Sequence, residues 1–453
     1  MQTTFKLTVC TLGMALTVLC FGAQNPPAIK PTATPSNLPI ADIDRFTTAI
    51  QQVKEYYVEP VNDDALFDNA IRGMLAGLDP HSSYLDASEY ADLQSTTQGE
   101  FGGLGIEVDM DNSWIRVVSP MDDTPAAKAG LKPGDLIIKI NNQPTDGMSL
   151  TDAVNQMRGP KGSPITLTVM RKGAKEPLQF KMVREVIRVQ SVKSKLLEPG
   201  YAYVRISQFQ APTANDLATA IQKLQSSNSG PLKGFILDLR NNPGGLLDSA
   251  VSVSDDFLDS KKLGANKLIV YTKGRTSTSS FKAYADSADR IHGIPMVVLV
   301  NGGSASAAEI VAGALQDQKR AIIMGKTTFG KGSVQTIFPL DTTHGVKITT
   351  ALYYTPNGRS IQAKGIVPDI DVSELAMNNA QDNSGDLLDV KEADLAKHLA
   401  NGNGNSTTTT PAPAPALPIP NAADPTKDYQ LNQALVLLKG LNTLHGADLK
   451  RPG

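Results

Sequence analysis

A serine and a lysine stand in small-residue surroundings that suit nucleophilic catalysis. Ser306 lies in the segment GGSASAAEI (302–310), and Lys331 lies in FGKGSVQ (329–335). A lysine amine can take the proton of a serine hydroxyl only when the amine is neutral. The usual lysine pKa is about 10.4, and lowering it to about 7–8 by burial costs about 4 kcal/mol. The alanines beside Ser306 and the apolar residues near Lys331 fit that demand.

The chain around Ser306 also has the order of elements that presents a nucleophile. Residues 295–300 (PMVVLV) predict a buried strand, the glycines at 302–303 a turn, and residues 306–315 a helix. Ser306 would then stand at the start of a helix, where free N–H groups favour negative charge. The Ala307 N–H is therefore a candidate donor to the oxyanion of an acyl-transfer reaction. If each motif is taken alone, the small residues could equally form a tight helix–sheet contact, and Lys331 could be a surface charge.

A second glycine turn offers another oxyanion donor. Residues 234–240 (GFILDLR) predict a strand, 241–245 (NNPGG) a turn, and 246–251 a helix. Backbone amides in such a turn could complete an oxyanion hole with Ala307. The sequence leaves open whether Gly244 or Gly245 would donate, and the turn could instead be purely structural.

These motifs together resemble the carboxyl-terminal processing (tail-specific) proteases, over about residues 40–372. The resemblance implies a Ser/Lys dyad in which the second serine of the SAS run, Ser306, is the nucleophile and Lys331 the general base. It also implies that Gln335, four positions after the lysine, orients Lys331. One departure is Ala308, a position that is often serine in the family. No cofactor is implied, and no His/Asp/Glu cluster has the spacing of metal ligands.

Residues 99–186 resemble a PDZ domain. Short alternating strands surround one helix at 150–157, and the segment AGLKPGDLI (129–137) strengthens the match. In such a domain the loop formed by Gly103, Leu104, Gly105 and Ile106 would bind the carboxylate of a substrate's C-terminus through backbone amides. The substrate tail would add as a β-strand and place its last, apolar side chain in a pocket.

The element pattern predicts an α/β fold, and the family resemblance implies a crotonase-like catalytic core with an inserted PDZ domain and an N-terminal helical domain. In the N-terminal domain, a helical stripe (Ile43, Phe46, Ile50, Val53, Tyr57) could pack in a core or against a second copy. The expected boundaries are a signal peptide at 1–23, a flexible tether at 24–38, the N-terminal helical domain at 39–98, the PDZ domain at 99–186, the Ser/Lys peptidase domain at 187–372, a largely disordered linker at 373–426 and a C-terminal helix at 427–453.

Composition bounds the location and the partners. Lys6, an apolar run and FGA (21–23) predict an export signal that is cleaved, or else kept as an anchor. We therefore expect a bacterial protein exported to the periplasm or cell envelope, with membrane contact only through an uncleaved N-terminus. Both cysteines lie in this segment, and a net charge of −2 gives no sign of nucleic-acid binding.

Three other functions compete with a tail-recognising endopeptidase. A Ser-His-Asp hydrolase would need one of the five histidines, with His292 or His344 as candidates. A catalytically inactive PDZ scaffold would not need Ser306, Lys331 and Gln335, and acyl-CoA chemistry fits poorly with export. The expected partners are protein or peptide substrates with apolar C-termini. A homodimer contact or an adaptor protein is left open.

Overall fold

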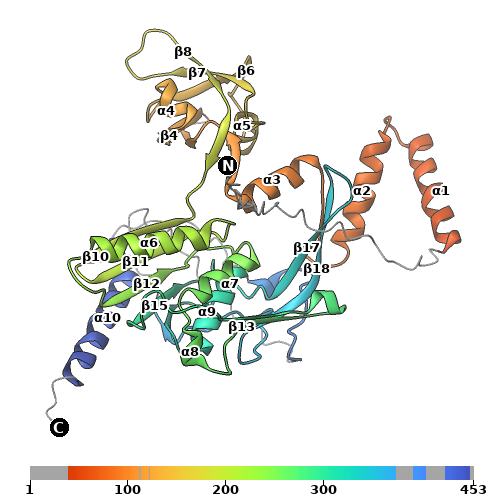
Figure 1. Ribbon diagram of the computed structural model, residues 1–453. Helices are drawn as coiled ribbons and strands as arrows, with labels where there is room; N and C mark the ends of the chain where they lie inside the picture. The colour runs from red at the N-terminus through yellow and green to blue at the C-terminus, as the bar shows by residue number, and fades with distance from the viewer. Residues whose placement is uncertain (1–38, 112–113, 122, 374–390, 405–423, 449–453) are drawn as a thin grey trace, which may run out of the picture. The chain divides into compact units, whose positions relative to one another are not determined.

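The computed structural model of the protein describes residues 39–111, 114–121, 123–373, 391–404 and 424–448 (Figure 1). The expected signal peptide and tether lie outside this part of the chain. The chain divides into two compact units, residues 1–66 and 67–453. In the first unit, helix α1 (Ile40–Tyr56) buries no side chain, and its predicted stripe is exposed: Ile43 by 45%, Phe46 by 46% and Val53 by 39%. Helix α2 (Asp63–Ala76) begins in this unit.

The predicted PDZ domain forms an antiparallel sheet around its own core. The strand order is β3-β4-β5-β7-β8, and the short strand β6 pairs with β5. Strands β2 and β9, the first and last of the domain in the chain, pair antiparallel with each other. Ile115, Ile137 and Leu167 are fully buried in its core. The elements are β2 (Glu100–Gly103), β3 (Ile106–Asp111), β4 (Trp114–Pro120), α4 (Pro125–Ala129), β5 (Leu136–Ile140), β6 (Gln143–Pro144), α5 (Leu150–Met157), β7 (Pro164–Met170), β8 (Leu178–Val183) and β9 (Glu185–Arg188).

The predicted catalytic core is a six-stranded sheet in the order β10-β11-β12-β15-β16-β19. All neighbours are parallel except β10 and β11, and a helix follows each of β11, β12 and β15 in the chain. Ligand-binding loops of such sheets gather at the carboxyl ends of the parallel strands. The strands are β10 (Val192–Glu198), β11 (Tyr201–Ile206), β12 (Gly234–Asp238), β15 (Met296–Val300), β16 (Ile322–Gly325) and β19 (Ile370–Asp371).

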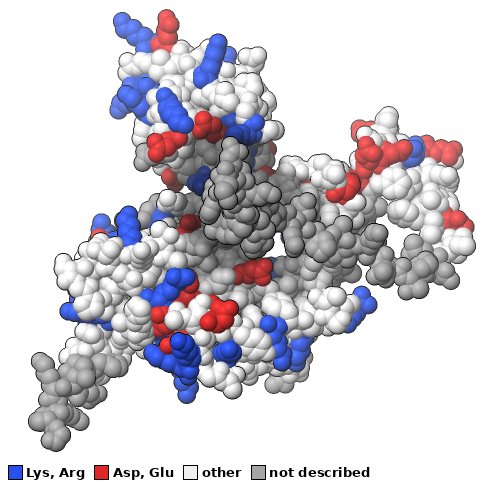
Figure 2. Space-filling view, viewed as in Figure 1, with Lys and Arg blue, Asp and Glu red and all other residues white. Residues whose placement is uncertain are grey.

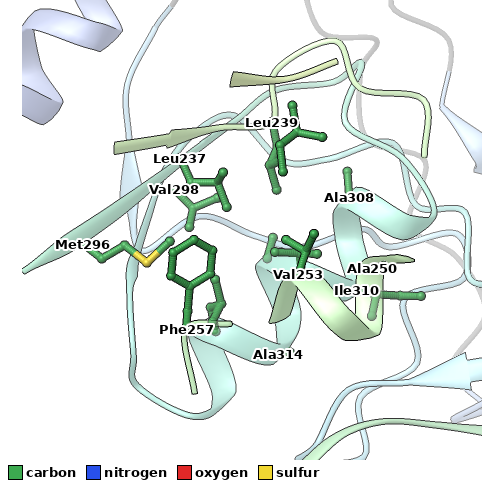
Figure 3. Close-up of a cluster of buried hydrophobic side chains, with 14 of the residues drawn as sticks. Leu237, Leu239, Ala250, Val253, Phe257, Met296, Val298, Ala308, Ile310 and Ala314 are labelled. Atoms are coloured by element: carbon green, nitrogen blue, oxygen red, sulfur yellow. The ribbon is translucent and has the colours of Figure 1, made fainter. Parts of the chain in front are cut away.

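Three helices cover one face of this sheet: α6 (Thr213–Ser227), α7 (Leu247–Asp255) and α9 (Ala307–Asp317). Figure 3 shows apolar side chains of α7 and α9 meeting those of β12 and β15. Phe257, just after α7, lies beside Val298 of β15 and Ala314 of α9. Every residue from Ala307 to Leu315 is buried, so α9 is fixed along most of its length. The fold class predicted from the sequence, an α/β core with an added PDZ domain, is confirmed.

A second sheet carries the lysine motif. Its order is β1-β18-β13-β14, and β17 pairs with β18. The segment around Ser83 forms β1 and pairs antiparallel with β18, with Ser83 opposite Lys347. The elements of this part are β1 (Ser83–Leu85), α3 (Ala87–Gln98), α8 (Ser260–Leu263), β13 (Leu268–Gly274), η1 (Ser277–Ser279), β14 (Lys282–Tyr284), β17 (Ser333–Pro339) and β18 (Gly345–Tyr354).

The C-terminal helix α10 (Tyr429–Asp448) packs on the other face of the central sheet, beside β12 and β15 (Figure 1). Leu431 and Leu438 are fully buried there. The structure differs from the expected disordered linker at residues 391–404, which include the short helix η2 (Glu392–Asp394) and are hydrogen-bonded to the catalytic core. Within the described residues, no helix is long and apolar enough to cross a membrane, and no metal-ligand cluster occurs.

Candidate active site

Two glycine turns meet at the carboxyl ends of neighbouring parallel strands. Strands β12 and β15 pair with Asp238 opposite Leu299, so the chain segments that follow them start side by side. The Asn241 N–H donates to Asn301 Oδ1 at 2.9 Å, and Asn301 Nδ2 donates to Asn241 Oδ1 at 2.7 Å. The Ser304 hydroxyl donates to the Leu239 carbonyl at 2.7 Å. Ser304 is therefore a structural link, whereas Ser306 is held at the helix start.

Ser306 precedes α9 in a conformation that favours glycine. Its φ is 53° and its ψ −114°, which is uncommon for a residue with a side chain and costs of order 1–3 kcal/mol. Such strain persists only where the surroundings impose it. Here the Ser306 N–H donates to Glu309 Oε2 at 2.8 Å, one turn ahead in α9.

The Glu309 carboxylate connects the serine and the lysine. The same oxygen, Oε2, accepts from the Lys331 N–H at 2.9 Å as well as from Ser306, and Oε1 accepts from the Gly330 N–H at 2.8 Å. The Thr328 hydroxyl also donates to Oε1. Glu309 is fully buried. Burial raises the pKa of Glu309 to about 7, although these hydrogen bonds favour the charged form. One buried carboxylate thus fixes the backbones of both predicted dyad residues.

The backbone around Lys331 is held on both sides. The Gly332 N–H donates to Gln362 Oε1 at 2.9 Å, and the Gly332 carbonyl accepts from the Tyr353 N–H at 2.9 Å. The Tyr353 hydroxyl donates to the Lys331 carbonyl. Tyr353 is 1% exposed; burial raises its pKa, and a hydrogen bond with the Ser306 side chain opposes that rise. Tyr353 therefore contacts both predicted dyad residues.

The surroundings of the Lys331 amine favour its neutral form. Burial lowers the pKa of Lys331, and the positive charge of Lys347 lowers it further. Carboxylates act in the opposite direction, chiefly Glu392 and Glu309, followed by Asp79. The net direction is downward, as a lysine base requires.

Gln335 lies in β17, at an irregularity in its pairing with β18. Its amide nitrogen donates to Ser333 Oγ at 3.0 Å and to Thr349 Oγ1 at 3.2 Å. No hydrogen bond joins Gln335 to Lys331 in the described part of the chain. Because the nitrogen is engaged, the carbonyl oxygen Oε1 is the group that Gln335 can offer to an amine.

The two candidate glycines differ in their hydrogen bonds. The Gly244 N–H donates to Asn242 Oδ1 at 2.9 Å, whereas no acceptor for the Gly245 N–H is found among the described residues. Gly244 has a φ of 101°, and a Cβ there would lie 2.7 Å from the Ser306 Cβ and 3.0 Å from the Ala307 nitrogen. The Ala307 N–H, at the first position of α9, likewise has no acceptor in the described structure.

The predicted carboxylate-binding loop of the PDZ domain has its carbonyls directed inward. The Leu104 carbonyl accepts from the Ala126 N–H at 3.0 Å, and the Gly105 carbonyl accepts from the Met121 N–H at 2.8 Å. Gly105 has a φ of 72°, and a Cβ there would lie 2.4 Å from Thr124. No acceptor for the Leu104 or Gly105 N–H is found among the described residues. Gly103 ends β2 and Ile106 starts β3, which is an edge strand.

The histidines of the rival triad lie elsewhere. His292 is exposed, and His344 bonds to Asp341 at 2.9 Å in the turn between β17 and β18. Neither forms a hydrogen bond with Ser306 within the described residues. In Figure 2, acidic side chains predominate over α1 and α2, whereas basic and acidic side chains are interspersed over the rest of the surface shown.

The sequence analysis missed two residues that contact the dyad. Glu309 follows Ser306 in the pattern Ser-x-x-Glu, a capping-box signature at a helix start that could have identified it. Tyr353 lies in an apolar strand, and nothing in the local sequence distinguishes it from a core residue.

Comparisons with known proteins place the chain in a family. The family model "Peptidase family S41" matches residues 200–372, "PDZ domain" matches 93–170, and "Activating protease CtpB N-terminal domain" matches 22–89. The carboxy-terminal-processing protease of Bartonella bacilliformis is 48% identical over 397 residues, which cover 87% of this chain and 88% of that protein. The carboxy-terminal processing protease CtpA of Bacillus subtilis is 38% identical over 328 residues, covering 72% and 68%.

Among solved structures, the photosystem II D1 C-terminal processing protease is similar, at 32% identity and a TM-score of 0.43, covering 72% of this chain and 86% of that one. The family matches and the two relatives give the same assignment. The chain belongs to the carboxy-terminal-processing proteases of peptidase family S41, a family of serine peptidases, and it carries a PDZ domain.

Proposed function

We propose that this protein is an exported endopeptidase of the periplasm or cell envelope that cleaves peptide bonds with a Ser306/Lys331 dyad. The observation that carries the proposal is the single Glu309 oxygen that accepts hydrogen bonds from the amides of both residues. A shared acceptor fixes the two backbones relative to each other, and burial favours the neutral amine that a base requires.

The reaction proceeds through an acyl-enzyme. Neutral Lys331 takes the Ser306 proton as the hydroxyl oxygen attacks the substrate carbonyl, and the resulting ammonium gives that proton to the leaving amine. A water molecule then attacks the ester, and Lys331 again acts as base. Gln335 orients the lysine through its carbonyl oxygen.

The oxyanion is stabilised by the N–H groups of Ala307 and Gly245. Gly245 is preferred to Gly244 because its N–H has no acceptor in the described structure, whereas the Gly244 N–H is bound by Asn242. Gly244 contributes space, since a side chain there would fill the volume beside Ser306 and Ala307.

Substrates are selected by their C-terminal tails. The Leu104 to Ile106 amides bind the tail carboxylate, and the tail pairs with the edge strand β3. The apolar stripe of α1 is exposed, so a second copy of this protein or an adaptor protein binds that helix.

The decisive experiment measures cleavage of an unfolded protein by purified Ser306→Ala, Lys331→Ala and His292→Ala/His344→Ala variants. We expect both dyad variants to stay folded and lose nearly all activity, and the histidine double variant to retain it. The rate should rise with pH as the Lys331 ammonium loses its proton. Near wild-type cleavage by Lys331→Ala would refute the dyad. Equal cleavage of one peptide with a free and an amidated C-terminus would refute tail recognition.

A further inference from the structure

A chain segment beyond the matched peptidase region is bound to the lysine side of the active site. We call residues 391–404 the strap; they follow the family match, which ends at residue 372. Asn401 Nδ2 donates to the Gln362 carbonyl at 2.6 Å, and Lys391 Nζ donates to the Thr327 carbonyl at 2.9 Å. The Glu392 N–H donates to the Phe329 carbonyl at 3.3 Å. The strap therefore contacts the chain just before Lys331.

Glu392 is the buried centre of these contacts. Its side chain is 0% exposed, and Oε1 accepts from Gln362 Nε2 at 2.8 Å. Gln362, also fully buried, uses its other amide atom, Oε1, to accept from the Gly332 N–H at 2.9 Å. Two hydrogen bonds through the Gln362 side chain thus connect the Glu392 carboxylate to Gly332, the residue directly after Lys331.

His81 closes the other side of Glu392. Its Nε2 lies 2.8 Å from Glu392 Oε2 and 3.0 Å from Oε1. The loop that carries His81 is itself anchored, because Asp79 Oδ1 accepts from the His81 N–H at 2.8 Å and from Thr349 Oγ1 at 3.0 Å. Thr349 is also the acceptor for Gln335. The same short loop therefore connects to both ends of the Lys331–Gln335 segment.

A buried carboxylate at this place has an electrostatic effect on the amine. Among the charged groups around Lys331, Glu392 acts with Glu309 and Asp79 against the effects of burial and Lys347. Removing the charge of Glu392 while keeping its shape should therefore lower the pKa of Lys331. Removing the whole side chain should also release Gln362 and the Gly332 amide.

We propose that Glu392, clamped by His81 and acting through Gln362, is a positioning residue for Lys331, and that the strap is part of the active site. This inference rests on the proposed Ser306/Lys331 chemistry. A Glu392 that only stabilised the fold would change the unfolding temperature without moving the pH dependence of the reaction.

The test compares full-length Glu392→Gln, Glu392→Ala and Asp216→Asn on a short peptide between pH 6 and 10. Asp216 is the matched control, because it is an exposed acid on α6, outside the strap, and no side-chain hydrogen bond or ion pair is found for it among the described residues. We expect Glu392→Gln to keep its plateau kcat/KM with the acid limb moved to lower pH. We expect Glu392→Ala to lose about 10- to 100-fold at the plateau, and Asp216→Asn to match the wild type.

An acid limb of Glu392→Gln that coincides with the wild-type limb, together with a Glu392→Ala plateau within twofold of wild type, would overturn the inference. Lys331→Ala, measured in parallel, distinguishes failure of the Glu392 role from failure of the dyad. If Lys331→Ala is inactive while the Glu392 variants give both of these results, only the role of Glu392 fails. If Lys331→Ala is active, the proposed dyad fails and this inference fails with it.

Discussion

Replacing Glu309 by glutamine tests the connection between the serine and the lysine. The carboxylate accepts four hydrogen bonds, two on each oxygen. A glutamine keeps one oxygen and presents an NH₂ group to the remaining two donors. The least damaging orientation places the NH₂ near Thr328, whose hydroxyl can accept, and leaves the Gly330 N–H without a partner.

The two energetic effects of this change have opposite signs. One buried, unpaired N–H costs about 1–3 kcal/mol at every pH. Wild-type Glu309 has its pKa raised from 4.5 to about 7, so the folded state loses stability as pH rises through that range. The loss amounts to about 3 kcal/mol once the carboxyl is ionised. Glutamine does not ionise, so the variant does not lose this stability at high pH. At pH 5 only the unpaired N–H matters, and the variant should be less stable than wild type by about 1–3 kcal/mol. At pH 8.5 the variant should be equally stable or more stable.

The assay is urea unfolding of the catalytic core at both pH values, in a Ser306→Ala background that prevents self-cleavage. Glu107→Gln, an exposed acid in the PDZ domain, is the control and should show no difference. In the active background, the acid limb of the rate should also move to lower pH, because Glu309 raises the pKa of Lys331. A stability difference that is the same at pH 5 and pH 8.5 would refute the reasoning.

Three further predictions concern other parts of the molecule. Gly244→Ala should lower kcat about 100-fold or more and also lower the unfolding temperature, because its φ of 101° is strained for alanine and its Cβ would lie 2.7 Å from the Ser306 Cβ and 3.0 Å from the Ala307 nitrogen; a kcat loss under tenfold would argue against that oxyanion position. Deleting residues 424–448 should lower the unfolding temperature and the activity, since two fully buried leucines and the partner of Arg240 are removed; an unchanged temperature would show that α10 is dispensable. Gly105→Ala, strained by its φ and by Thr124, should impair cleavage of tailed proteins more than of short peptides, and equal effects on both would exclude a role in tail binding.

Local sequence patterns could predict the elements around the nucleophile. The apolar run before Ser306, the glycines and the small-residue helix predict β15 and α9 with bounds that differ by one or two residues. The reason is that the strand, the turn and the helix lie within about twenty consecutive residues. The spacing of their apolar residues and the glycines of the turn are enough to indicate each element. The same local patterns predict the glycine turn at Gly244, but its place beside Ser306 was implied only by the family resemblance.

What could not be predicted depends on contacts between distant parts of the chain. Glu392 bonds to Gln362 and faces His81, and no local pattern joins these three positions. The strap also lies in a stretch whose composition favours disorder; its order comes from hydrogen bonds to the core rather than from its own propensity. Gln335 was identified by spacing, but its bond to Thr349 required the register of β17 and β18.

The position of α10 has a consequence for the newly made protein. Arg240, one residue before the glycine turn, is 3% exposed and bonds through Nη1 and Nη2 to Asp428, at the start of α10. Residues 424–448 leave the ribosome after the whole catalytic core has been synthesised. Until they do, Arg240 lacks this partner, and the sheet face that Leu431 and Leu438 cover is open. Until then, Arg240 beside the nucleophile turn is held, among the described residues, by Asp238 alone, and the second face of the central sheet is covered last.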